Sequence, residues 1–116
     1  MLRLSSLTFF IIATSLSPCW AACQASDIAI RQADWHRVRD TIKIVGEFFN
    51  QCSEPTGVQL AFTFRDDAGK VVGVKELWPA STRNVEPKST YSFELMIESY
   101  PSASSMAARV LEVRRW

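Results

Sequence analysis

The sequence predicts an all-β protein: an immunoglobulin-like antiparallel β-sandwich of six to seven strands within residues 22–116. Three observations predict it. Several short runs alternate apolar and polar residues with the period of two that a half-buried strand needs. Clusters of glycine, proline, aspartate and serine separate these runs, as turns do. Beyond residue 22 no segment shows the apolar spacing of a helix, and this combination favours a single small sandwich.

The clearest strands are residues 41–50 and residues 58–65, where the alternation of side chains is most regular. A glycine in the middle of the first strand indicates a bulge or a close neighbouring side chain. The predicted inward positions are Ile42, Ile44, Gly46 and Phe48 in the first strand, and Val58, Leu60, Phe62 and Phe64 in the second.

Four further segments complete the predicted sandwich, and they are residues 26–33, 71–78, 91–97 and 107–115. Residues 35–40 are predicted to form a polar connection between the first two strands, which would place Ile30 opposite Gly46. If this register is continued to the cysteines, Cys23 and Cys52 fall one residue short of lying opposite each other. A bulge or the loop geometry at the cysteines must account for that one residue. Pro79 ends the strand before it or marks an edge of the sheet.

Several motifs fall within residues 45–72. Residues 45–50 loosely fit the strand pattern V-x-G-x-V-x-N. The motif F-x-L-Y-D aligns with residues 62–66, where Phe62 and Asp66 match, Phe64 is a conservative change and Arg65 replaces the tyrosine. Residues 66–72 fit the turn D-x-x-G-x-V-V. In these motifs, residues 40–98 resemble the FxLYD domains, which are small bacterial extracytoplasmic modules. The resemblance implies an immunoglobulin-like sandwich. It implies no particular activity, because the family has no general assigned one.

The N-terminal residues 1–21 have the pattern of a secretory signal peptide. Arg3 provides a positive start, an apolar run follows over residues 4–16, and small residues surround Ala21. The apolar run is too short to span a bilayer, so we expect cleavage after Ala21, a mature domain of residues 22–116 and no transmembrane anchor. The alternative is an uncleaved N-terminal anchor. With cleavage, the sequence predicts a periplasmic or secreted bacterial protein.

Cleavage after Ala21 leaves two of the three cysteines, Cys23 and Cys52. A pair of cysteines in a small exported domain usually forms a disulfide, and we expect one here. The alternative is a lipoprotein acylated on Cys23, although Trp20 stands where such signals usually carry leucine. The mature chain would hold 12 basic and 12 acidic residues. A neutral balance gives no electrostatic case for binding nucleic acid or an anionic membrane.

The sequence offers no convincing reaction centre, so we predict no catalytic residue, no metal ligand and no cofactor. His36 is the only histidine and has no partner at triad or metal spacing. Asp66 and Asp67 are explained by turn chemistry, since the loop lacks the spaced oxygen ligands of a calcium site. Glu47 and Glu94 are predicted on outward faces of different strands, where glutamates usually serve solvation.

Aromatic residues at strand ends and loops form the candidate interaction surface, and these are Trp78, Tyr100 and Trp116. Exposed aromatics can stack on sugars or dock a protein, or they can simply close the ends of a sandwich. We therefore expect a non-enzymatic module that engages an envelope protein. The alternatives are a carbohydrate or peptidoglycan binder that uses these aromatics and, third, a small hydrolase.

Overall fold

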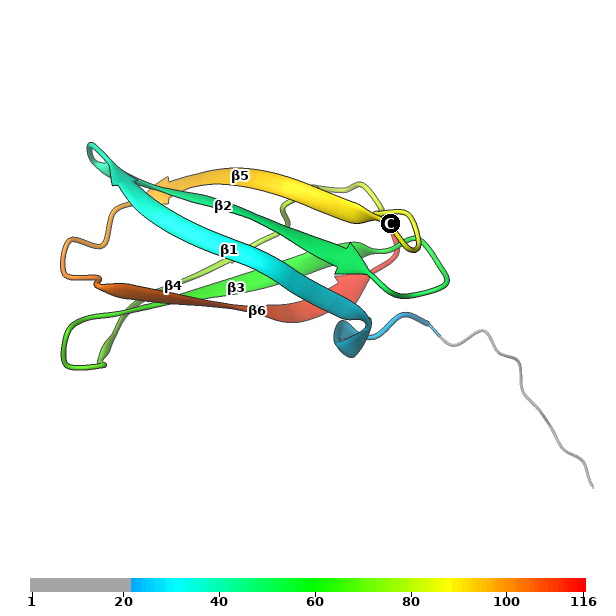
Figure 1. Ribbon diagram of the computed structural model, residues 1–116, viewed down its shortest axis with the longest axis horizontal. Helices are drawn as coiled ribbons and strands as arrows, with labels where there is room; N and C mark the ends of the chain where they lie inside the picture. Colours follow the sequence, from blue (N-terminus) through cyan, green and yellow to red (C-terminus); the bar gives the residue numbers. More distant parts are fainter. Residues whose placement is uncertain (1–21) are drawn as a thin grey trace, which may run out of the picture.

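The computed structural model describes residues 22–116 as two three-stranded antiparallel sheets packed face to face (Figure 1). One sheet has the order β1-β2-β5 and the other the order β4-β3-β6. The predicted all-β sandwich is confirmed, with six strands. A short 3₁₀ turn, η1 (Ala25–Asp27), precedes them. The strands are β1 (Ile28–Val38), β2 (Thr41–Asn50), β3 (Gly57–Arg65), β4 (Val71–Leu77), β5 (Thr90–Glu98) and β6 (Ser105–Arg114).

The strand order is that of an immunoglobulin-like sandwich. In the constant type, strands A, B and E belong to one sheet and strands C, F and G to the other, and a strand C′ can be added beside C. Here β1, β2 and β5 take the places of A, B and E, while β3 and β6 take those of C and F, with β4 beside β3. No described strand takes the place of G, beside β6.

The core lies between the two central strands, β2 and β3. Their inward side chains are the ones that the alternation predicts, and Ile42, Phe48, Phe62 and Phe64 are fully buried. Aromatic contacts cross the core, since the Phe62 and Phe93 ring centroids lie 6.3 Å apart. Burying each large apolar side chain contributes about 1.5–3 kcal/mol, so this layer supplies most of the driving force for folding.

The first hairpin differs from the prediction. Residues 35–38 belong to β1, and the connection to β2 is only the two-residue turn Arg39–Asp40, where Arg39 has a φ of 59°. Trp35 is inward and meets Phe64 edge-on, with centroids 5.5 Å apart. The prediction of a polar connection was wrong because Arg37, although charged, occupies an inward position of a strand.

The register of this hairpin shifts accordingly. Ala33, and not Ile30, lies opposite Gly46, whereas Ile30 lies opposite Phe48. A β-bulge does occur in β1, between Ile30 and Gln32. The prediction of a close neighbour at Gly46 is confirmed: a Cβ there would come within 2.8 Å of the Phe93 ring and would also overlap a carbonyl of β1.

Residues 1–21, which carry the predicted signal peptide, lie outside the described part of the chain. Within residues 22–116, no helix is long and apolar enough to cross a membrane.

Candidate interaction surfaces

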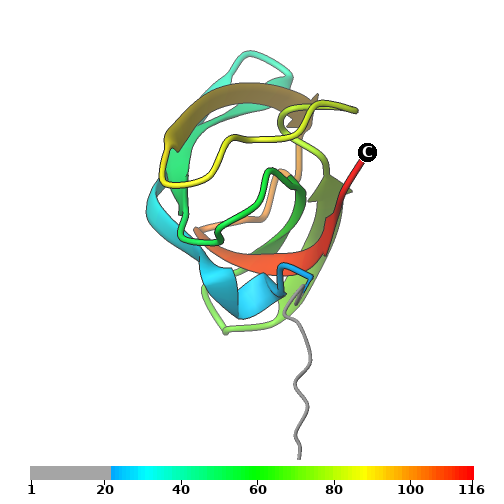
Figure 2. The same ribbon diagram turned by 90° about the vertical axis from the view of Figure 1, so that its right-hand side faces the viewer.

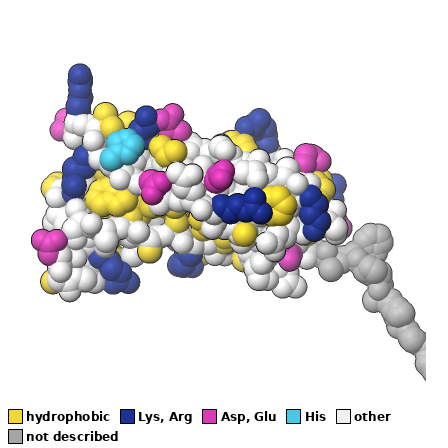
Figure 3. All heavy atoms as spheres, viewed as in Figure 1, with side chains coloured by type: hydrophobic (Ala, Val, Ile, Leu, Met, Phe, Trp, Pro, Cys, Tyr) yellow, Lys and Arg dark blue, Asp and Glu magenta, His cyan; other side chains and the backbone are white. Residues whose placement is uncertain are grey.

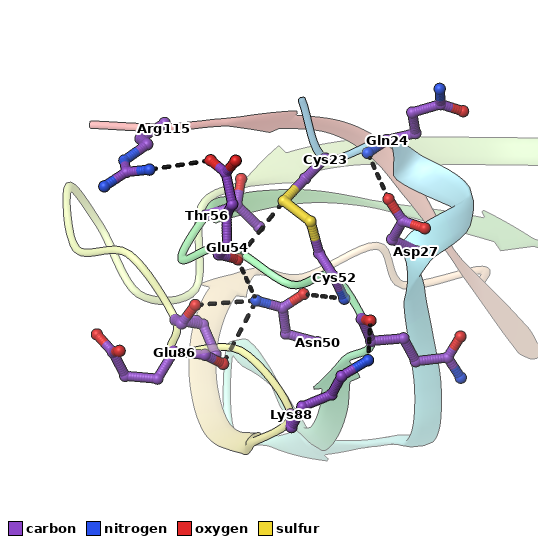
Figure 4. Close-up of a disulfide and its surroundings, with 12 residues drawn as sticks. Cys23, Gln24, Asp27, Asn50, Cys52, Glu54, Thr56, Glu86, Lys88 and Arg115 are labelled. Atoms are coloured by element: carbon purple, nitrogen blue, oxygen red, sulfur yellow. Dashed lines mark hydrogen bonds and ion pairs between the residues drawn. A yellow bond between two sulfur atoms is a disulfide. The ribbon is translucent and has the colours of Figure 1, made fainter. Parts of the chain in front are cut away.

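The disulfide predicted between Cys23 and Cys52 is present at one end of the sandwich (Figure 4). The two Cα atoms lie 5.7 Å apart, and the bond ties the segment before η1 to the residues just after β2. Closing a loop of 29 residues contributes about 3–4 kcal/mol in the chain-entropy model. The bond therefore fixes the start of β1 against the rest of the fold.

Asn50 organises the same end, and the sequence reading did not single it out. Its side-chain amide is fully buried and donates to the carbonyl oxygens of Glu54, at 3.1 Å, and Val85, at 3.0 Å. Its Oδ1 accepts from the backbone N–H of Cys52 at 2.8 Å. A buried polar group satisfied in this way fixes loops rather than serving as a reactive group. The alternation in β2 could have found it, because residue 50 falls on the inward face.

Trp78 and Trp116 form one aromatic cluster, on the outer face of the β4-β3-β6 sheet. Their ring centroids lie 5.2 Å apart, nearly perpendicular. The Arg114 guanidinium lies 5.3 Å from the Trp78 centroid and 5.1 Å from that of Trp116. Gly57 leaves room for the Trp116 indole, and Asn84 holds the Trp116 backbone through two hydrogen bonds. The faces of both rings are therefore partly covered by the protein itself.

Tyr100 lies at the opposite end of the sandwich and does not join this cluster. Its ring packs on Phe64, with centroids 5.2 Å apart, and covers Gly73. Gly57, beneath Trp116, and Phe64, beside Tyr100, are separated along β3 by roughly 23 Å at about 3.3 Å per residue. The three aromatics of the predicted surface are thus two separate groups, and Tyr100 closes its end of the core.

The remaining polar candidates take structural positions. Asp66 accepts two backbone N–H groups, from Ala68 and Lys70, each at 2.9 Å, so its carboxylate shapes the β3–β4 turn. Glu94 pairs with Lys43 on the outer face of the β1-β2-β5 sheet. Glu47 shares that face, and His36 lies on β1 opposite Lys43. Within residues 22–116 no three metal-binding side chains come together.

The edge strand β4 carries features that disfavour pairing with a foreign strand. A bulge interrupts its pairing with β3 near Val72, and Pro79 follows soon after the strand. Lys75 lies opposite Phe62, on the core side of an edge strand, and pairs with Glu98 of β5 at 2.6 Å. This hydrogen bond raises the pKa of Lys75 and lowers the pKa of Glu98. Bulges and inward charges are features that keep foreign strands away from an edge.

The connection between β4 and β5 contacts the first residues of β5 through side chains. The Tyr91 hydroxyl donates to the carbonyl of Pro79 at 3.4 Å. Arg83 in that connection donates to the same hydroxyl at 3.2 Å and lies over the Tyr91 ring. Side-chain contacts therefore cross the seam between β4 and β5 near both ends of β5.

The other seam lies between β1 and β6, which run side by side at the opposite edge of the sandwich (Figures 1 and 2). The disulfide and η1 close one end of it. At the other end, Arg37 donates to the carbonyl oxygens of Tyr100, Pro101 and Ala103 at 3.1, 3.0 and 2.8 Å. Between these two closures, β6 pairs only with β3, and no described strand pairs with its outer edge.

The comparisons with known proteins add no relative: no family model, no curated protein and no solved structure matches this chain.

Proposed function

We propose that this protein is a non-enzymatic, immunoglobulin-like module of the bacterial periplasm or exterior that binds another envelope protein. The observation that carries the proposal is the edge of β6. No described strand pairs with this edge, although β1 lies close to it, whereas a bulge interrupts the pairing of β4 and a Tyr91 contact with Pro79 lies at the start of β5. An unpaired edge is a ready template for a strand of a partner.

Export belongs to the same proposal. The signal-like pattern of residues 1–21 and the Cys23–Cys52 disulfide both support an oxidising compartment. A thioether to a lipid and a disulfide cannot both form at Cys23, so the disulfide favours a free module over a lipoprotein. The motif resemblance to FxLYD domains, which are extracytoplasmic modules, supports the same placement. Within the fold, the matching Phe62 is a buried core residue and Asp66 shapes the turn.

The test is site-specific photo-crosslinking in the periplasm, with the probe at Ala107 on β6. We expect a discrete crosslinked envelope protein from that site. A probe at Glu76 on β4 is the matched control and should give much less product, because that edge strand disfavours pairing with a foreign strand. Equal crosslinking from both positions, or none from either, would contradict the proposal.

A second candidate function, binding of carbohydrate or peptidoglycan, draws support from Trp116, whose exposed fraction is 43%. A sugar would have to stack where Arg114 now lies on both indole rings. Sedimentation with purified peptidoglycan distinguishes the two functions. Saturable binding that is lost in Trp78→Ala would favour the carbohydrate function over the protein-binding one.

A further inference from the structure

The outer edge of β6, which β1 approaches but does not pair with, adjoins an incompletely covered part of the core. The inward side chains of β6 that face β3 are Met106, Ala108 and Val110, and each remains half-buried although it packs against the core. Figure 3 shows hydrophobic side chains along the middle of this side of the molecule, between the strand layers. A strand added beside β6 would cover them and would gain the free energy of burying its own apolar side chains.

The charges along the two seams differ in sign. Strands β1 and β6 together carry four arginines against one aspartate and one glutamate. Strands β4 and β5 together carry one lysine against three glutamates. Arg114 pairs with Glu112, Arg31 lies over the Phe49 ring and Arg37 donates to loop carbonyls. The positive charge that a partner strand at β6 would meet is therefore that of Arg109, to which acidic side chains would be complementary.

Arg109 marks the position on β6 where an acidic side chain of an added strand would be favoured. It is exposed in the middle of β6, it points to the outer face opposite Ala61, and among residues 22–116 it has no ion-pair partner. Glu112 and Glu54 pair instead with Arg114 and Arg115. An acidic residue directly across from Arg109 on an added strand would lie close enough to form a cross-strand ion pair.

We propose that the edge of β6 accepts an extended acidic segment of a partner protein as an additional antiparallel strand. The apolar side chains of this segment turn inward over Met106, Ala108 and Val110, and its acidic side chains turn outward, one of them opposite Arg109. This inference rests on the proposed function and specifies the partner as an alternating apolar and acidic segment.

The test uses two synthetic peptides of about ten residues, one alternating valine with glutamate and the other valine with lysine. Binding to the full mature protein is measured by fluorescence anisotropy and by NMR shifts of the β6 amides. We expect the acidic peptide to bind and the basic peptide to bind far more weakly. Arg109→Glu should weaken the acidic peptide about fivefold and strengthen the basic one. Lys70→Glu, the same charge change on the β3–β4 turn, should alter neither.

Two proline variants locate the edge. The backbone N–H groups of neighbouring strand residues point to opposite sides, so one of Ala107 and Ala108 directs its N–H toward β3 and the other toward the outer edge. Of Ala107→Pro and Ala108→Pro, we expect one to unfold the protein more easily. The other should keep the wild-type unfolding midpoint and lose the acidic peptide.

Three outcomes would overturn the inference. The first is equal binding of both peptides, and the second is retained binding in the stably folded proline variant. The third is concentration-dependent self-association in ultracentrifugation that this variant abolishes, because the edge would then serve a second copy of the chain. If crosslinking from Ala107 still captures an envelope protein while the acidic peptide does not bind, this inference fails and the proposed function stands. If neither occurs, both fail.

Discussion

The two seams of this sandwich, where an edge strand of one sheet lies beside an edge strand of the other, are held by different contacts. Between β4 and β5, the Lys75–Glu98 ion pair and the Arg83–Tyr91–Pro79 contacts bring polar groups of the chain across the gap. Between β1 and β6, the strands themselves lie close together, the disulfide and Arg37 add contacts at the two ends, and β6 keeps half-buried apolar side chains beside an unpaired edge. The difference shows that two seams around one core can be closed by different contacts, mainly polar side chains at β4/β5 and the approach of two strands at β1/β6.

The largest expected effect concerns the core beneath both seams. Phe62 lies on the central strand, opposite Lys75 on one side and Ala108 on the other, and it is fully buried. Phe62→Ala should lower the free energy of unfolding by about 3–5 kcal/mol. Thr63→Ala, on the opposite face of the same strand, should cost a few tenths of a kcal/mol. Urea unfolding measures both, and equal shifts of the midpoint would contradict the assignment of faces.

The disulfide closes one end of the β1/β6 seam, and its loss is expected to rank next. The double variant Cys23→Ser, Cys52→Ser should lower the free energy of unfolding by about 2–4 kcal/mol. Reduction of the wild-type protein should give a similar loss, and reduction should leave the double variant unchanged. Intact mass of the exported protein provides an independent check, since two free thiols or a lipid on Cys23 would contradict the bond.

Arg37 closes the other end of the seam, with an intermediate expected effect. Arg37→Met keeps most of the apolar stem but removes three hydrogen bonds to loop carbonyls, and it should cost about 1–2 kcal/mol. All three carbonyls accept from one guanidinium nitrogen, Nη2. Arg37→Lys should therefore recover part of the loss, to the extent that the shorter lysine side chain brings its ammonium to the same place. Hydrogen exchange should quicken first in residues 100–104. Unchanged exchange there would show that the seam is closed by other contacts.

The smallest effect should come from the β4/β5 side, where Lys75 and Glu98 are solvent-accessible. The pKa of Glu98 is lowered from its ordinary 4.5 by the hydrogen bond from Lys75. The stabilisation is therefore present above pH 4.5 and is lost as the pH falls through the lowered pKa. Glu98→Gln should flatten this part of the stability–pH curve, and Lys75→Met should do the same. A stability–pH curve that stays unchanged in both variants would contradict the pairing. Added salt should reduce the stabilisation from this exposed ion pair.

Strand alternation predicted the core well, because burial on one face imposes a period of two on the sequence, as in the run from Val58 to Phe64. The same rule failed at Arg37, where a long charged side chain occupies an inward position but reaches carbonyl groups beyond the strand. The separation of Tyr100 from Trp78 and Trp116 depends on which strands share a sheet and on their register. Local patterns do not encode that information, so the aromatics appeared as one set.

The first hairpin has a consequence for oxidation of the protein. Ile28 pairs with Asn50, so the hairpin brings the chain segments that carry Cys23 and Cys52 together just beyond its last pair. Pairing of β1 with β2 already includes the loss of chain entropy needed to bring the two thiols together. Each thiol is then present at a high effective concentration near the other. A reduced chain thus needs only its first two strands, and not the finished sandwich, to bring Cys23 and Cys52 together for oxidation.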